Sequence, residues 1–215
     1  MKVAIFGATG MVGGEVLEQC LVDDKIESVL AIGRRKIGVD HPRLKEIEHA
    51  DFLDFTALES ELANVEVCFY CLGVYQSRVS KEQFWKITVD YLEALVRAFE
   101  RANQSVCFCL FSAQGASTSE RSPIRFAKAK GRAENVLLAS KLAEKYIFRP
   151  GFIMSGPQSN NATLSAKLFE PIYRLFPTIG IDAPELARVI VDVGINRHEK
   201  TVFGNRDMRA YGASR

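Results

Sequence analysis

The chain has 215 residues, of which 47% are hydrophobic and 25% charged, a composition typical of a soluble globular protein with one good-sized core. Its 28 basic and 26 acidic residues nearly balance, so the net charge of +2 favours neither nucleic acid nor a membrane surface as a partner. Cys68, Cys107 and Cys109 lie in apolar runs, which indicates reduced, buried thiols. With no secretory signal or membrane-spanning run expected, we predict a cytoplasmic protein.

Strand-like apolar runs alternate with helical patterns along the first 150 residues. Strands are predicted at 2–6, 28–32, 47–52, 66–72, 105–112 and 145–149, and helices at 11–22, 54–63, 80–102 and 123–143. Ser80 and Gln83 have capping-box spacing at the start of the third helix. Near-continuous apolar strands separated by helices are typical of a parallel sheet buried on both faces. We therefore predict one α/β domain over residues 1–215, with a doubly wound parallel sheet.

The pattern changes after residue 150. An amphipathic stretch within 158–182 is interrupted by Pro171, and "DAPE" then places Asp182 and Glu185 at capping-box spacing before a helix to about 196. "TVFG" at 201–204 predicts a last short strand. We expect the region of about 151–182 to form a small C-terminal cap over the carboxyl ends of the strands, where open α/β sheets bind ligands. The pattern does not separate a substrate lid from a protein contact.

Three glycines join the first strand to the first helix. Gly7, Gly10 and Gly13 have G-x-x-G-x-x-G spacing, which permits a tight turn, a close approach of backbone to a pyrophosphate, and packing of helix on strand. In this context the pattern predicts dinucleotide binding, the alternative being a turn that only links two elements. The cofactor contacts expected from this segment are Gly7, Thr9, Gly10, Met11, Val12 and Gly13.

The second strand ends in "IGRRK". An NAD site usually has an acidic residue here, about 20 residues after the glycines, to accept hydrogen bonds from the ribose. This chain has Arg34 and Arg35 instead, and guanidinium groups suit a 2′-phosphate through bidentate, charge-assisted hydrogen bonds. A solvated charge pair is the alternative. The pattern favours NADP(H) over NAD(H).

Further cofactor contacts are expected where the third and fourth strands end. Asp51 can accept a hydrogen bond from the adenine amino group beside Phe52, unless it is an ordinary surface residue. Cys71, Leu72 and Gly73 close the fourth strand, and the glycine would let the backbone pass close to the cofactor.

The segments "GATGMVGG", "IGRRK", "ADF", "CLG", "FSAQGAS", Lys130-Gly131 and "FRPG" occur in the order found in the short-chain dehydrogenase/reductase superfamily. The chain resembles its atypical branch over about 2–204, most closely the Tat-interacting-protein type of NAD(P)H-binding oxidoreductase-like proteins. The resemblance implies a Rossmann-type doubly wound parallel sheet and an active site of Ser, Tyr and Lys.

By this resemblance the Ser corresponds to Ser112 and the Lys to Lys130. In the family the Lys lowers the pKa of the Tyr phenol and binds the nicotinamide ribose, while the Tyr gives its proton to the carbonyl that is reduced. Phe126 stands at the Tyr position and has no proton to give, a loss of about a hundred- to ten-thousand-fold in rate. The family's Asn or Asp on the helix after strand four aligns with Thr88.

Tyr75, in the loop after the fourth strand, is the hypothesised surrogate proton donor. Other interpretations remain open: Ser112 as a hydroxyl that satisfies nearby backbone, and Lys130 as an exposed helix lysine. We expect no metal site, because Cys68 and Cys71 would point to opposite faces of a strand.

Two functions are consistent with these patterns. One is an NADP(H)-binding regulator or sensor, with weak or absent oxidoreductase activity, whose cofactor state alters a protein partner. The other is an NADPH-dependent reductase of a small carbonyl substrate with a surrogate acid. The missing Tyr favours the first, and the protein is expected to act as a monomer or a homodimer, with a small-molecule substrate or a regulatory protein as its partner.

Overall fold

A parallel sheet lies at the centre of the protein in its computed structural model, which describes residues 1–154 and 180–213. The strand order is β3-β2-β1-β4-β5-β6-β9, and every neighbouring pair is parallel. The strands are β1 (Lys2–Phe6), β2 (Ser28–Gly33), β3 (Leu44–Glu48), β4 (Val67–Tyr70), β5 (Cys107–Phe111), β6 (Glu144–Arg149) and β9 (Val202–Gly204). This order, which reverses between β1 and β4, confirms the predicted doubly wound α/β fold.

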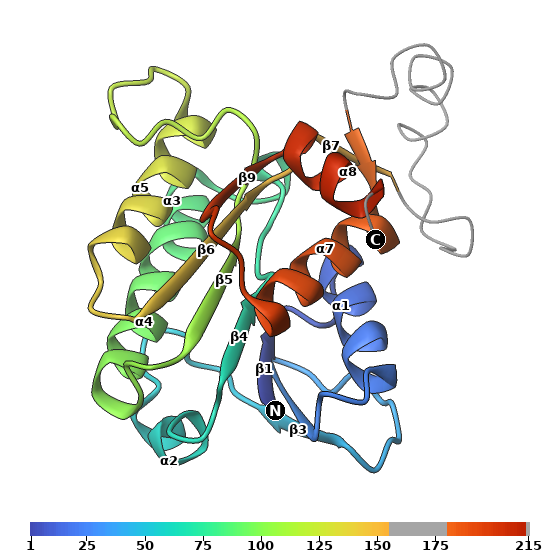
Figure 1. The fold of residues 1–215 in the computed structure, drawn as a ribbon. Helices are drawn as coiled ribbons and strands as arrows, with labels where there is room; N and C mark the ends of the chain where they lie inside the picture. The colour runs from blue at the N-terminus through green and yellow to red at the C-terminus, as the bar shows by residue number, and fades with distance from the viewer. Residues whose placement is uncertain (155–179, 214–215) are drawn as a thin grey trace.

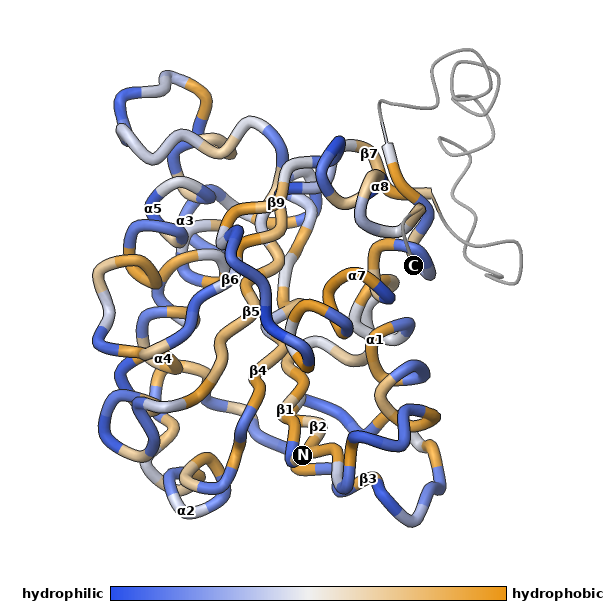
Figure 2. The backbone as a smooth tube through the Cα atoms, in the orientation of Figure 1, coloured by the Kyte–Doolittle hydropathy of each residue, from blue (hydrophilic) through white to orange (hydrophobic). Residues whose placement is uncertain are grey.

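Helices cover both faces of the sheet (Figure 1). The helices on one face are α1 (Met11–Val22) and α7 (Ala183–Asn196), with α8 (Asn205–Ala213) packed against α7. Those on the other face are α2 (Glu59–Leu62), α3 (Lys81–Trp85), α4 (Tyr91–Ala102) and α5 (Arg125–Ala139). In the hydropathy view the central strands are mostly orange, as expected for strands buried on both sides (Figure 2).

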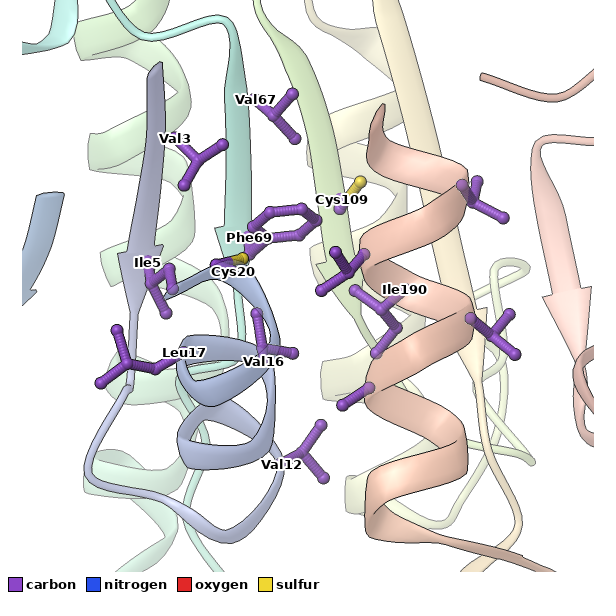
Figure 3. Packing of buried hydrophobic residues seen from close by; sticks show 14 of the residues in the cluster. Val3, Ile5, Val12, Val16, Leu17, Cys20, Val67, Phe69, Cys109 and Ile190 are labelled. Carbon is purple, nitrogen blue, oxygen red and sulfur yellow. The ribbon is translucent and has the colours of Figure 1, made fainter. Parts of the chain in front are cut away.

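Two hydrophobic clusters, one on each face, hold the layers together. Burial of one large apolar side chain contributes about 1.5–3 kcal/mol. Figure 3 shows the first cluster, between the sheet and the α1/α7 layer, with Ile5, Val12, Val16, Leu17, Cys20, Phe69 and Ile190 among its members. The second, under α2, α4 and α5, is rich in aromatic rings: Phe6, Phe52, Phe55, Tyr70, Phe99 and Phe108.

The region around the third strand differs from the prediction. The strand predicted at 47–52 is wrong in its bounds, because β3 ends at Glu48. Asp51 instead forms a turn, in which its Oδ1 accepts from the N–H of Leu53 (3.0 Å) and its carbonyl accepts from the N–H of Asp54 (3.2 Å). The helix predicted at 54–63 is a 3-10 turn, Thr56–Leu58, followed by the short α2.

The helix predicted at 80–102 is present as three consecutive segments. Its capping box is confirmed, since Ser80 Oγ accepts from the N–H of Gln83 (3.1 Å) and Gln83 Oε1 accepts from the N–H of Ser80 (3.2 Å). A π-helical turn, Lys86–Asp90, then separates α3 from α4.

The C-terminal part was predicted only in outline. Helix α7 follows Asp182 as expected, with a proline in its first turn, but the predicted capping box is wrong because the Asp182 side chain makes no cap hydrogen bond. Two short parallel strands, β7 (Phe152–Met154) and β8 (Gly180–Asp182), were not predicted, nor was α8. The rest of the expected cap lies outside the described residues.

Candidate functional site

The turn between β1 and α1 requires glycine at two positions. Gly7 has φ +91°, in the left-handed region, and a Cβ on it would lie 2.8 Å from the carbonyl carbon of Cys71. A Cβ on Gly13 would lie 2.1 Å from the carbonyl oxygen of Gly7. The N–H of Gly10 donates to that same oxygen at 2.9 Å. The turn therefore brings the start of α1 and the end of β4 close to β1.

The first turn of α1 opens at this edge of the sheet. Gly10 is the N-cap residue of α1, and it supplies no side-chain cap to the first turn. Such a helix start, with its positive dipole end and no Cβ in the way, suits a pyrophosphate. Val12 is buried, so only its backbone is placed for such a contact, whereas Met11 is partly exposed.

A cavity beside this turn joins segments that lie far apart in the sequence. It runs along the ends of β1 and β2 and is lined by Gly7, Ala8, Thr9, Ala31, Ile32, Gly33, Arg34, Arg35, Ile37, Glu46, Ile47, Phe52 and Leu72. The structure thus brings the glycine turn and the arginine pair to one cavity. Both arginines are exposed, and within the described part of the chain neither forms an ion pair.

Glu46 is a lining residue that the sequence interpretation missed. Its carboxylate accepts hydrogen bonds from the backbone N–H groups of Ile37 and Gly38, the second at 3.3 Å. It therefore holds the loop that follows Arg34 and Arg35. No motif signals this role, because Glu46 lies on the neighbouring strand and meets the loop only through the parallel pairing of β2 with β3.

The other residues predicted to contact the cofactor differ in whether they line this cavity. Phe52 and Leu72 line the cavity, but Asp51 is exposed and is not among its lining residues. A Cβ on Gly73 would meet no protein atom within 4 Å, so packing within the described residues does not require glycine there. Burial raises the pKa of the Cys71 thiol to about 12, which keeps it protonated at neutral pH.

Ser112, just after β5, belongs to a buried polar network. Its hydroxyl donates to Glu134 Oε1 at 2.6 Å, and Glu134 is fully buried. The same carboxylate accepts from Arg149 Nε at 2.9 Å and from Arg149 Nη2. Sequence reasoning missed Glu134; its signal is the position one helical turn after Lys130, which places it on the same face of α5.

Lys130 lies beside this network. Its Nζ is 3.5 Å from the carbonyl oxygen of Phe111, a long hydrogen bond, and 5.8 Å from the centre of the Phe111 ring. Burial lowers the pKa of the Lys130 amine to about 8, although the nearby Glu134 and Cys71 act in the opposite direction. The amine is therefore not the ordinary exposed helix lysine of the alternative interpretation.

Phe126, which stands at the Tyr position of the family pattern, is an apolar residue in apolar surroundings. The ring of Phe126 stacks on Phe84 of α3, with centroids 6.2 Å apart and planes at 28°. Val74 and Val79 pack in the same small cluster. This position therefore provides an apolar wall one helical turn before Lys130.

Tyr75 and Thr88 lie in contrasting environments. Tyr75 is 63% exposed, and its ring lies 5.2 Å from the Arg78 guanidinium carbon, so its surroundings are those of a surface residue. Thr88 is buried within the π-helical turn, a type of irregularity that is frequent at functional sites. The five cysteines are all free, and the described residues contain no cluster of His, Cys, Asp and Glu suited to a metal.

Comparison with known families agrees with this geometry. A sequence family described as NAD(P)H-binding matches residues 7–193. The chain belongs to this family. It is an NAD(P)H-binding protein of the atypical short-chain dehydrogenase/reductase type, which confirms the resemblance drawn from its motifs.

Two relatives show how distant the similarity is. Protein HTATIP2 of Rattus norvegicus is 27% identical over 164 residues, which are 74% of this chain and 65% of that protein. Protein FMP52, mitochondrial, of Eremothecium gossypii is 29% identical over 162 residues, 75% of this chain and 70% of that protein. The match thus spans less than two thirds of the length of HTATIP2.

Solved structures share the fold at low sequence identity. A short chain dehydrogenase family protein from Francisella tularensis has a TM-score of 0.69 at 13% identity, covering 94% of this chain and 96% of that one. An oxidoreductase of the short chain dehydrogenase/reductase family from Burkholderia thailandensis has a TM-score of 0.70 at 14% identity, covering 97% and 92%. These similarities confirm the Rossmann-type architecture.

Proposed function

We propose that this protein binds NADP(H) in preference to NAD(H), and that its oxidoreductase activity is weak or absent because Phe126 replaces the catalytic Tyr. The observation that carries the proposal is the single cavity in which Arg34 and Arg35 accompany the glycine turn. The N–H groups of the first turn of α1 bind the pyrophosphate, and the two guanidinium groups bind the 2′-phosphate. Phe52 and Leu72 provide an apolar wall for the adenine.

The other end of the site would receive the nicotinamide and its ribose. Lys130 donates to a ribose hydroxyl there, as the family pattern implies. The bound cofactor supplies hydride chemistry. Phe126 has no proton to give, and Ser112 directs its only proton to Glu134, so the Tyr and Ser positions give no proton to a ligand. This supports a protein whose cofactor state affects a regulatory partner.

An active NADPH-dependent reductase of a small carbonyl substrate is the second candidate. The observation that favours it is the buried amine of Lys130, whose lowered pKa suits proton transfer near neutral pH. Tyr75 is less well placed as a surrogate proton donor than the sequence suggested, because its ring is exposed and lies beside Arg78.

Cofactor selectivity in arginine variants tests the first proposal. Arg34→Ala and Arg35→Ala should each weaken NADPH binding by about tenfold or more, since a hydrogen bond to a charged group is worth about 1.5–3 kcal/mol. NADH affinity should stay within about twofold, because NADH has no 2′-phosphate. Arg121→Ala, at an exposed arginine away from the cavity, is the control. Unchanged NADPH affinity in both cavity variants would refute the phosphate assignment.

The cellular setting is part of the same proposal. No helix within residues 1–154 and 180–213 is both long enough and apolar enough to cross a membrane. Five free cysteines support a reducing compartment, and we place the protein in the cytoplasm as a monomer or homodimer. Fractionation of cells that express it would contradict this if the protein sediments with mitochondria, the location in the name of the FMP52 relatives.

A further inference from the structure

The edge formed by the end of β5 and the first half of α5 has few groups able to give a proton to a ligand. Phe126 has none, and the Tyr75 phenol is exposed beside Arg78. Ser112 has one proton, and it points to Glu134 at 2.6 Å. Lys130 keeps N–H groups for which the described residues offer only one long contact.

The network around Glu134 fixes the direction of the Ser112 hydroxyl. Glu134 is fully buried, and its oxygens accept from Ser112 and, twice, from Arg149. Turning the Ser112 proton toward a ligand would remove a charge-assisted hydrogen bond from a buried carboxylate, which is unfavourable. Ser112 Oγ can therefore only accept a hydrogen bond from a ligand. A carbonyl oxygen of a ligand needs a donor instead.

Among the described residues, Lys130 has a backbone hydrogen-bond acceptor but no carboxylate partner. Its ammonium has three donors, and the described residues offer it one long contact, to the carbonyl of Phe111 at 3.5 Å. No carboxylate of the described residues lies within ion-pair distance of it, since Glu134 pairs with Arg149 instead. Two N–H groups are thus left for a ligand.

The charges that surround Lys130 come from several elements. Glu134 on α5 and Cys71 after β4 both favour its charged form, but burial has the larger effect and lowers the pKa to about 8. On the π-helical turn packed against α5, Lys86 is exposed and Asp90 lines a separate groove beside Arg97. An acid with such a pKa is still charged at neutral pH yet gives up its proton readily.

We propose that the Lys130 amine is the acid–base group of this site, giving its proton directly to the oxygen of a bound carbonyl ligand in place of the missing phenol. This inference rests on the proposed NADP(H) binding, with the reduced cofactor as the source of the hydride that reaches the carbonyl carbon. As the carbonyl π bond breaks toward oxygen, an O–H bond forms there and an Nζ–H bond of Lys130 breaks. The neutral amine then takes a proton from water.

The first test measures Lys130 in the full chain without cofactor. Nuclear magnetic resonance of protein labelled at lysine Nζ and Cε should show one amine titrating near pH 8, whose signal disappears in Lys130→Arg and persists in Lys128→Met. Lys128, exposed on the same helix, is the matched control. A Lys130 midpoint above pH 10 would overturn the proposal.

The second test separates proton donation from ribose binding. Arginine keeps the charge and the donors but does not release a proton in proteins. In reduction of 4-nitrobenzaldehyde by NADPH, Lys130→Arg should lower kcat by about a hundredfold with NADPH affinity within threefold, and should abolish the fall of kcat above pH 8. Lys130→Met should lower kcat at least as much, and Lys128→Met should not lower it.

Each outcome bears on one claim or the other. Full kcat in Lys130→Arg, or no wild-type turnover of the aldehyde at any pH between 6 and 9 while NADPH binds, would overturn the role of Lys130. Failure of the wild type to bind NADPH would instead refute the proposed cofactor function, and the titration midpoint would still decide whether Lys130 has the properties of an acid. Circular dichroism of each variant checks that it is folded.

Discussion

The two halves of the carboxyl edge of the sheet are built in different ways. Around β1 and β2 the site is built from backbone: Gly7 and Gly13 let three chain segments approach, and exposed arginines complete the cavity. Around β5 and α5 it is built from buried side chains, with Glu134 and Arg149 at the centre. The first half retains what dinucleotide binding needs, whereas the second has an apolar ring where the family has its acid. We therefore expect substitutions in the first half to change cofactor binding and substitutions in the second to change catalysis.

The largest expected effect is on the β5/α5 half alone. Arg149→Met leaves the buried Glu134 carboxylate without its two guanidinium donors, which should lower the free energy of unfolding by about 3–5 kcal/mol. Urea denaturation at pH 7 measures this loss in the free energy of unfolding. Arg97→Met, which removes an exposed ion pair with Glu93, should lose about 1 kcal/mol or less. Equal losses in the two variants would mean that the Glu134 network is no more important than a surface pair.

The next effect is a pH dependence of stability from Lys130. Its pKa is about 8 in the folded protein against an ordinary 10.5, so the unfolded chain binds more protons between these values. Stability due to this group therefore rises with pH from 8 to 10.5, by about 3 kcal/mol, and is lowest below pH 8. In Lys130→Met this rise should be missing from denaturation curves across that range. If the stability of Lys130→Met changes with pH as that of the wild type does, Lys130 is not the source of the rise. The Lys128→Met control should show the same rise in stability as the wild type.

Restoring the phenol would sharpen the contrast between binding and chemistry. Phe126→Tyr places an acid one helical turn from Lys130 and should raise the kcat of NADPH-dependent aldehyde reduction by about a hundredfold, equivalent to about 2.7 kcal/mol. NADPH affinity should change by less than about twofold. If kcat does not rise, the orientation of Ser112 toward Glu134 limits the reaction more than the lack of a phenol.

The smallest effect comes from adjacent glycines in the β1/β2 half. Gly13→Ala forces a Cβ to 2.1 Å from the Gly7 carbonyl and should lower stability by about 1–3 kcal/mol and weaken NADPH binding. Gly14→Ala meets the Ala8 oxygen at an ordinary 3.5 Å and should stabilise the helix by up to about 1 kcal/mol. Denaturation and NADPH titration compare the two; similar behaviour would show that the turn tolerates a side chain at Gly13.

The sequence predicts local and repetitive features better than tertiary ones. The sheet, the glycine turn and the Ser80 capping box follow from spacing within one element or between neighbours. The end of β3 was misplaced because the Asp51 turn lies within an apolar-looking run. Glu46 and Glu134 carry no motif of their own, since their partners lie on other elements and meet them only after the chain has folded.

Calorimetric titration of the wild-type protein with NADPH and with NADH, at one salt concentration and pH 7, tests most directly whether the β1/β2 half is a working cofactor site. We expect NADPH to bind at least about tenfold more tightly than NADH, because its 2′-phosphate meets two guanidinium groups. Equal affinity for the two cofactors would contradict the assignment of Arg34 and Arg35, and no binding of either would contradict the proposed function as a whole.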